Sequence, residues 1–239
     1  MKTLKIVALS LVSMMSMSAM AQDKVEGTVG ADVVSRYVWR GQVLGDAAIQ
    51  PTAGLSYKGF ALDAWASYSF VDSKKYDKEF DLTLSYSTGG FNVGVTDYYF
   101  SKPEGENKYF EYRNGYTKHV WEAFVGYDFG CFDMEWYTNF AGNDGVNKSG
   151  KRAYSSYFTL SAPFKLATCD WKATVGIVPY ATDFYADANG FAVTNVSLRA
   201  TKEFKVCKNW SVPVFAEGIA NPSTKKGYLV VGMSLGLPE

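Results

Sequence analysis

The sequence predicts an all-β protein, a transmembrane antiparallel up-and-down β-barrel of about twelve strands. Three observations favour this fold class: apolar and polar residues alternate with a period of two, short and long connections alternate along the chain, and aromatic residues gather near the strand ends. Acidic and basic residues are equal in number, 24 of each, so no basic excess is available to hold a nucleic acid.

The first 21 residues have the layout of a secretory signal peptide. Two lysines precede an apolar stretch from Ile6 to about Val12, and a small-x-small sequence follows at Ala19–Ala21. The apolar stretch is much shorter than the roughly 20 residues that a spanning helix needs, and no later run approaches that length. We therefore expect a signal peptide over 1–21 and a single bacterial outer-membrane β-barrel domain over 22–239.

The clearest alternation lies in residues 79–86, where large apolar side chains share one face and polar side chains the other. Applied along the chain, the same pattern predicts strands near the roughly 9 to 11 residues that a tilted membrane-crossing strand requires. The expected strands are 25–40, 48–58, 59–70, 79–88, 91–100, 118–129, 131–141, 154–163, 169–180, 191–204, 210–220 and 227–237.

The expected connections are short on one side of the barrel and long on the other, as in bacterial outer-membrane barrels, whose short turns face the periplasm. The short ones are 58–59, 89–90, 130–131, 165–168 and 205–209. The long ones are 42–47, 71–78, 101–117, 142–153, 181–190 and 221–226.

Aromatic residues at the strand ends suit the two interfaces of a membrane. Tyr86 and Phe91 flank a short turn, and Tyr37 and Trp39 are expected on the outer face near a long loop. A soluble β-sandwich would bury its large aromatic side chains in the middle of the strands. A soluble lipocalin-like barrel is the alternative, and carbonate washing of membranes distinguishes the two.

The segment Ser35–Gly41, with the sequence S-R-Y-V-W-R-G, resembles the TorF-type porin family of exported outer-membrane proteins. Gln50–Pro51, Gly54–Tyr57, Gly59–Phe60 and Trp65–Ser67 extend the resemblance over about the first fifth of the chain. The resemblance implies an outer-membrane barrel with channel activity, and it brings no catalytic or binding residues with it.

Charged residues on the polar face are expected to face the lumen, because a charge on the lipid side costs a few kcal/mol. They either set the charge preference of a pore or form an ion-pair network that fills a narrow barrel. Acids outnumber bases, so an open pore is expected to prefer cations weakly. The candidates are Asp32, Arg36, Arg40, Asp63, Asp81, Glu122, Glu135, Lys172, Arg199 and Glu217.

Arg36 and Arg40 are expected on the same inward face of the first strand. They could attract an anionic solute at the mouth of a pore, but pairing with an acid such as Glu217 is the favoured interpretation. Cys131, Cys169 and Cys207 each fall at a short turn. A Cys169–Cys207 disulfide and three free thiols are both compatible with the sequence.

His119 is the only histidine, and Trp121 stands where a Ser-His outer-membrane lipase would carry its serine. We therefore expect no enzymatic activity, and a lone His with no Cys or His neighbours predicts neither a metal nor another cofactor. The expected function is passive diffusion of small hydrophilic solutes through a porin-like barrel surrounded by membrane lipid. The alternative is a structural or adhesive outer-membrane barrel with an occluded lumen and outer loops that bind a ligand or partner.

Overall fold

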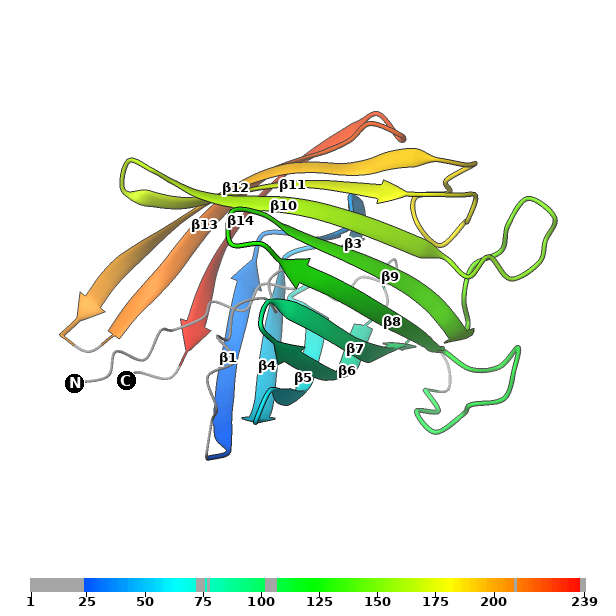
Figure 1. Cartoon of the computed structure of the whole chain (residues 1–239), viewed down its shortest axis with the longest axis horizontal. Helices are drawn as coiled ribbons and strands as arrows, with labels where there is room; N and C mark the ends of the chain where they lie inside the picture. Colours follow the sequence, from blue (N-terminus) through cyan, green and yellow to red (C-terminus); the bar gives the residue numbers. More distant parts are fainter. Residues whose placement is uncertain (1–23, 72–75, 77, 102–106, 209, 237–239) are drawn as a thin grey trace.

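Twelve antiparallel strands close into a single barrel in the computed structural model, which describes residues 24–71, 76, 78–101, 107–208 and 210–236 (Figure 1). Each strand pairs with the next barrel strand in sequence, and β1 pairs with β14 to complete the ring. The barrel strands are β1 (Glu26–Val34), β4 (Ala48–Tyr57), β5 (Phe60–Ser69), β6 (Lys78–Thr88), β7 (Phe91–Ser101), β8 (His119–Asp128), β9 (Asp133–Gly142), β10 (Ser156–Leu166), β11 (Cys169–Val178), β12 (Ala192–Cys207), β13 (Trp210–Asn221) and β14 (Lys226–Gly236). The predicted fold class is confirmed, and the expected signal peptide lies outside the described residues.

The prediction of one continuous strand over 25–40 is wrong. The wall strand β1 ends at Val34, and the chain then forms a separate two-stranded sheet from β2 (Tyr37–Trp39) and β3 (Gln42–Gly45). The expected loop 42–47 therefore contains a strand. Alternation could not show this difference, because the period of two continues without a break from the wall into the hairpin.

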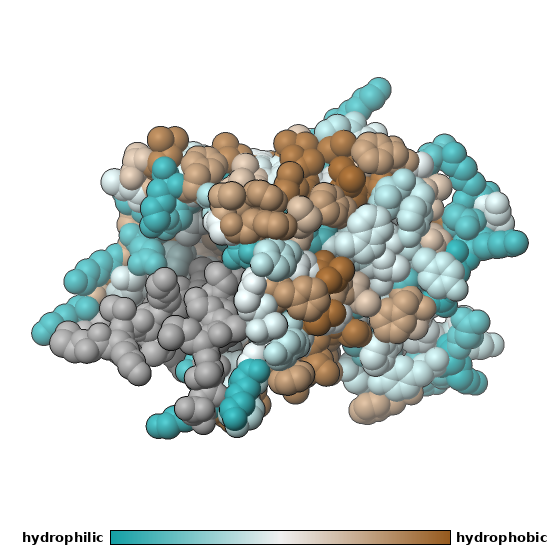
Figure 2. All heavy atoms as spheres, in the orientation of Figure 1, coloured by the Kyte–Doolittle hydropathy of each residue, from teal (hydrophilic) through white to brown (hydrophobic). Residues whose placement is uncertain are grey.

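The outer face of the barrel is apolar. Figure 2 shows brown apolar residues across the middle of the visible face, with teal hydrophilic residues gathered mostly at its two ends. Exposed side chains on the outer face include Val29, Leu55, Leu62, Leu84, Val93, Val125, Leu160, Val175, Val196, Leu198 and Val231. A soluble monomer rarely exposes large apolar side chains over so many neighbouring strands.

The inner face is polar. Buried polar side chains there bond across neighbouring strands, as Thr83 does with Thr96 at 2.9 Å and Thr174 with Ser161 at 3.0 Å. Other buried polar residues on this face are Asp32, Gln50, Asp81, Glu122, Asp133, Glu135 and Thr159. Polar side chains inside and apolar side chains outside is the arrangement of a membrane-spanning barrel. No helix in the described part of the chain is long and apolar enough to cross a membrane.

Candidate functional site in the barrel lumen

The inner hairpin, residues 37–45, folds into the end of the barrel that bears the long loops. Tyr37 and Trp39 are only 4% and 7% exposed, so both lie inside and not in the outer aromatic belt where they were expected. The ring of Tyr37 packs on Trp65 of β5 at 5.5 Å, and that of Trp39 packs on Tyr98 of β7 at 5.7 Å. The hairpin therefore fills the loop end of the lumen with aromatic side chains.

The turn of the hairpin packs against β12 and β13. Arg40 and Gly41 have φ angles of 49° and 78°, the left-handed pair that a tight two-residue hairpin turn needs. The Asn221 side chain of β13 donates a hydrogen bond to the Gly41 carbonyl at 3.0 Å. A Cβ atom at Gly41 would lie 1.8 Å from the carbonyl oxygen of Thr194 in β12, so only glycine fits there.

Gly41→Ala is expected to destabilise the protein by about 2 to 4 kcal/mol, because the methyl group meets backbone and the left-handed φ disfavours alanine. Gly218→Ala is the matched control, since a Cβ there has no neighbour within 4 Å. Urea unfolding of both variants measures the difference. Equal stabilities of the Gly41→Ala and Gly218→Ala variants would show that Gly41 is not packed tightly against β12.

Arg40 makes a buried ion pair with Glu122 of β8. The guanidinium Nη2 donates to Glu122 Oε1 at 2.9 Å and Nη1 donates to Oε2, which is the two-bond geometry of a strong arginine–carboxylate pair. The hydroxyls of Tyr98 and Tyr185 donate to the same carboxylate at 2.8 and 2.7 Å. The two charged side chains are 8% and 0% exposed, so the pair is shielded from water.

Aromatic rings surround the Arg40 guanidinium. Its central carbon lies 4.4 Å from the ring of Trp39, 4.1 Å from Tyr137, 4.7 Å from Tyr157 and 5.2 Å from Tyr185. Each of these distances lies within the range of a cation–π contact. We call Glu122, Tyr98, Tyr137, Tyr157 and Tyr185 the cation cage.

The loop after β11 holds the hairpin from the side. The Gln42 side chain donates from Nε2 to the Phe184 carbonyl at 3.3 Å and accepts the Ala186 amide at 2.7 Å. Phe184 also packs edge-on against Trp39, with ring centroids 6.3 Å apart. Hairpin and loop thus stabilise one another inside the loop end of the barrel.

Most of the charged residues predicted to face the lumen lie on the inner face of the wall. They are Asp32, Asp63, Asp81, Glu122, Glu135, Lys172, Arg199 and Glu217. Arg199 and Glu217 approach to 3.8 Å across β12 and β13, and Lys172 approaches Asp133 at 3.7 Å. The lumen therefore contains two neighbouring ion pairs besides the Arg40–Glu122 pair, since Lys172 lies opposite Arg199 in the sheet.

The prediction that Arg36 and Arg40 share the inward face of the first wall strand is wrong, because neither residue belongs to β1, although Arg40 does face the lumen and pair with an acid. Arg36 is exposed between β1 and β2, and Arg40 lies in the hairpin turn. Arg40 pairs with Glu122, whereas Glu217 pairs with Arg199. The turn carries Arg40 across the lumen, which a straight strand could not do.

Of the two possibilities for the cysteines, a Cys169–Cys207 disulfide or three free thiols, the structure has the three free thiols. The register pairs Asp170 with Thr201, which places Lys202 opposite Cys169. Cys207 lies further along β12, about 16 Å from that point at the usual rise of a strand. This separation is well beyond the roughly 7 Å that a disulfide spans between Cα atoms.

A second buried pair, which the sequence did not indicate, lies on the outer face. Asp97 of β7 and His119 of β8 are joined at 2.7 Å, and the other ring nitrogen of His119 meets the Tyr109 carbonyl. Tyr112 packs on the same imidazole at a tilted angle, with ring centroids 4.7 Å apart. The loop before β8 thus covers a hydrogen-bonded pair of polar side chains that would otherwise face outward. None of these partners is a serine, so the contacts of His119 do not provide a Ser-His nucleophile.

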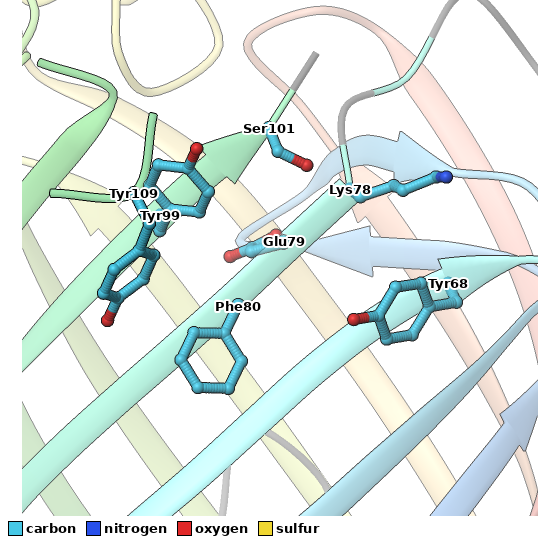
Figure 3. A pocket seen from close by; sticks show the side chains of 7 residues that line it. All are labelled: Tyr68, Lys78, Glu79, Phe80, Tyr99, Ser101 and Tyr109. Carbon is cyan, nitrogen blue, oxygen red and sulfur yellow. The ribbon is translucent and has the colours of Figure 1, made fainter. Parts of the chain in front are cut away.

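A cavity of about 370 Å³ adjoins this covered pair on the outer wall. Figure 3 shows Tyr68, Phe80, Tyr99 and Tyr109 around it, with Lys78 and Glu79 at the strand end.

In the loop between β7 and β8, hydrogen bonds from Arg113 lower the pKa of Glu111 to about 2. Glu111 therefore keeps its charge at every pH a living cell maintains.

Fold and site together define a closed β-barrel with an apolar outside, a polar inside and a loop end filled by its own hairpin. No family model matches the chain, and no curated protein matches it. The resemblance to TorF-type porins therefore stays a prediction.

Among the solved structures that the chain resembles weakly are two porins. A refined porin structure is 12% identical with a TM-score of 0.36, covering 81% of this chain and 63% of that one. The complex of Salmonella typhi OmpF with daunomycin is 10% identical with a TM-score of 0.36, covering 89% of this chain and 97% of that one. This chain spans less than two thirds of the length of the refined porin. Similarities this low assign neither family nor function.

Proposed function

We propose that this protein is a bacterial outer-membrane barrel through which small hydrophilic solutes diffuse, and that its inner hairpin narrows the path. The observation that carries the proposal is the closed barrel with an apolar outer face and a polar inner face. Such a wall is stable when hydrocarbon surrounds it and water enters it. A signal peptide over 1–21 would deliver the chain to the envelope.

The two ends of the lumen offer solutes different paths. At the turn end the inner-face residues of β12, such as Glu203 and Lys205, are exposed. At the loop end, Tyr157 and Tyr185 are fully buried against the inner hairpin. The hairpin is therefore the constriction, and it sets the size limit for solutes.

The inner face supports a weak preference for cations. Acidic side chains outnumber basic ones there, and Arg199 and Lys172 are already near acids. A water-filled path between walls of one charge sign concentrates ions of the opposite sign. A reversal potential that indicates marked anion selectivity would contradict this preference.

Swelling of liposomes that contain the refolded full-length protein tests the proposal. We expect slow swelling in small sugars and amino acids, with a rate that falls steeply as the solute grows. Protein-free liposomes and liposomes with heat-denatured protein are the controls. An absence of swelling with every solute would overturn the pore.

The second candidate function is a structural or adhesive outer-membrane barrel with an occluded lumen. The filled loop end favours it, as do exposed aromatic residues on the long loops: Phe110 is 84% exposed and Tyr116 is 71% exposed. Such side chains are common in binding surfaces. Under this alternative the intact protein gives no swelling, although cells that carry it adhere to a partner surface.

A further inference from the structure

We propose that the cation cage is a binding site for organic cations with a guanidinium head, and that Arg40 occupies it as a built-in ligand. The proposal deepens the proposed function, because it names a class of solute that the constriction recognises. Arg40 reaches this site from the inner hairpin, whereas every member of the cage belongs to the wall or to the loop after β11.

The cage is built from elements distant in the sequence. Tyr98 belongs to β7, Glu122 to β8, Tyr137 to β9 and Tyr157 to β10, while Tyr185 comes from the loop. These are neighbouring strands, so their inward side chains meet on one patch of the inner wall. Removing Arg40 alone would therefore leave the carboxylate, its two hydroxyl donors and three rings in place.

The chemistry of the patch matches a planar cation. Glu122 presents both oxygens to the guanidinium, and Tyr137, Tyr157 and Tyr185 place their rings 4.1 to 5.2 Å from its carbon. A guanidinium can satisfy a two-oxygen acceptor and stack on aromatic rings at the same time, whereas a compact ammonium cannot. Aromatic rings around an acid are a known way to recognise organic cations.

Charge balance favours a cation at this site when Arg40 is removed. Glu122 is fully buried, and among the described residues Arg40 is its salt-bridge partner. A buried carboxylate without a counter-charge is strongly unfavourable. A state in which the hairpin leaves the lumen leaves the Glu122 carboxylate without Arg40, and a solute with a guanidinium head has the charge and the shape to take its place.

The test measures binding without requiring a pore. The Arg40→Ala variant of the full chain is refolded in detergent micelles, and its thermal unfolding is followed with rising millimolar methylguanidinium. Urea is the uncharged ligand of matching shape. We expect methylguanidinium to raise the Tm of R40A by a few degrees and to saturate, as linkage of binding to folding requires. Urea at the same concentrations should give no rise.

Two control proteins, wild type and a double variant, show whether the stabilisation comes from binding at Glu122. Wild type, with Arg40 in the cage, should respond at least about tenfold more weakly than R40A, because ligand and Arg40 compete for the same carboxylate. The double variant R40A/E122Q should show no saturable rise, because it lacks the charge. An unresponsive R40A, or an equal response from R40A/E122Q, would overturn the site.

If R40A fails to fold alone, refolding in the presence of methylguanidinium replaces the thermal experiment. Rescue of the folded fraction by methylguanidinium but not by urea supports the site, and no rescue overturns it. The outcome is separate from that of the proposed function. If methylguanidinium stabilises R40A but liposomes do not swell, the proposed pore is wrong and the proposed binding site stands. If liposomes swell but methylguanidinium does not stabilise R40A, the binding site is wrong and the pore stands.

Discussion

Glu122→Gln is expected to lower the free energy of unfolding by about 3 to 5 kcal/mol, the cost of leaving one member of a buried ion pair without its partner. The substitution keeps the shape of the side chain but removes the charge that Arg40 meets. Arg40 is 8% exposed, so water cannot compensate its guanidinium in the folded state. Urea unfolding in lipid vesicles, followed by tryptophan fluorescence, measures the loss.

Glu217→Gln is the matched control. Its partner Arg199 is 3.8 Å away, and the two side chains are 21% and 16% exposed, so the pair is longer and wetter than that of Arg40. We expect a loss below about 1 kcal/mol, as for other partly solvated pairs. Similar losses for E122Q and E217Q would mean that the lumen at Glu122 is filled with water, contrary to the buried cage.

Leu84→Arg is expected to cost about 2 to 4 kcal/mol, because a charge at mid-height on the lipid face of a barrel must leave water for hydrocarbon. Leu84 is 57% exposed on the outer face, and its cross-strand neighbours there are Leu62 and Val95. Reversible unfolding in vesicles gives the free energy. In a soluble barrel the same exposed position would accept arginine at little cost.

The control for Leu84→Arg introduces the same charge on the other side of the wall. Thr52 faces the lumen beside Trp65 and is half-buried. We expect Thr52→Arg to cost clearly less than Leu84→Arg, because the arginine can reach water and acids inside the barrel. The reverse order of the two costs would refute the assignment of inside and outside.

The alternation of apolar and polar residues predicted the wall strands because each of them has hydrocarbon on one face and the polar lumen on the other. In β6, Phe80, Leu82 and Leu84 lie on the outer face and Asp81 and Thr83 on the inner face, as the sequence alone indicates. Except for the first strand, whose predicted end lies six residues beyond Val34, expected strand ends differ from the observed ones by only a few residues for this reason. Alternation is a local signal, so one sequence is enough to predict these strands.

The inner hairpin was missed because alternation with a period of two fits both a straight wall strand and a hairpin strand. Tyr37 and Trp39 continue the period of β1, yet their side chains enter the lumen. The one available signal was Arg40–Gly41, since a glycine in a two-residue turn favours a hairpin over a straight strand. The Arg40–Glu122 pair joins residues 82 positions apart, and no local pattern reports such a contact.

The outer Asp97–His119 pair was missed for a different reason. Asp97 falls on the apolar face of β7, where the pattern predicts a residue that meets lipid. The loop carrying Tyr109 covers it, and loop conformation is not encoded in strand periodicity. A single acidic residue among the outward-facing residues of a strand, such as Asp97, is the sequence feature that indicates a loop packed over the outer face.

The most direct measurement of the central claim, that the inner hairpin constricts a pore, is single-channel conductance in planar bilayers. Wild type is compared with a variant in which a flexible Gly-Ser linker replaces residues 37–45, and a folded barrel is verified for both. We predict a small conductance for wild type and a several-fold larger one for the variant, because Tyr37, Trp39 and Arg40 leave the lumen. Equal conductances, or no current from either protein, would contradict the account.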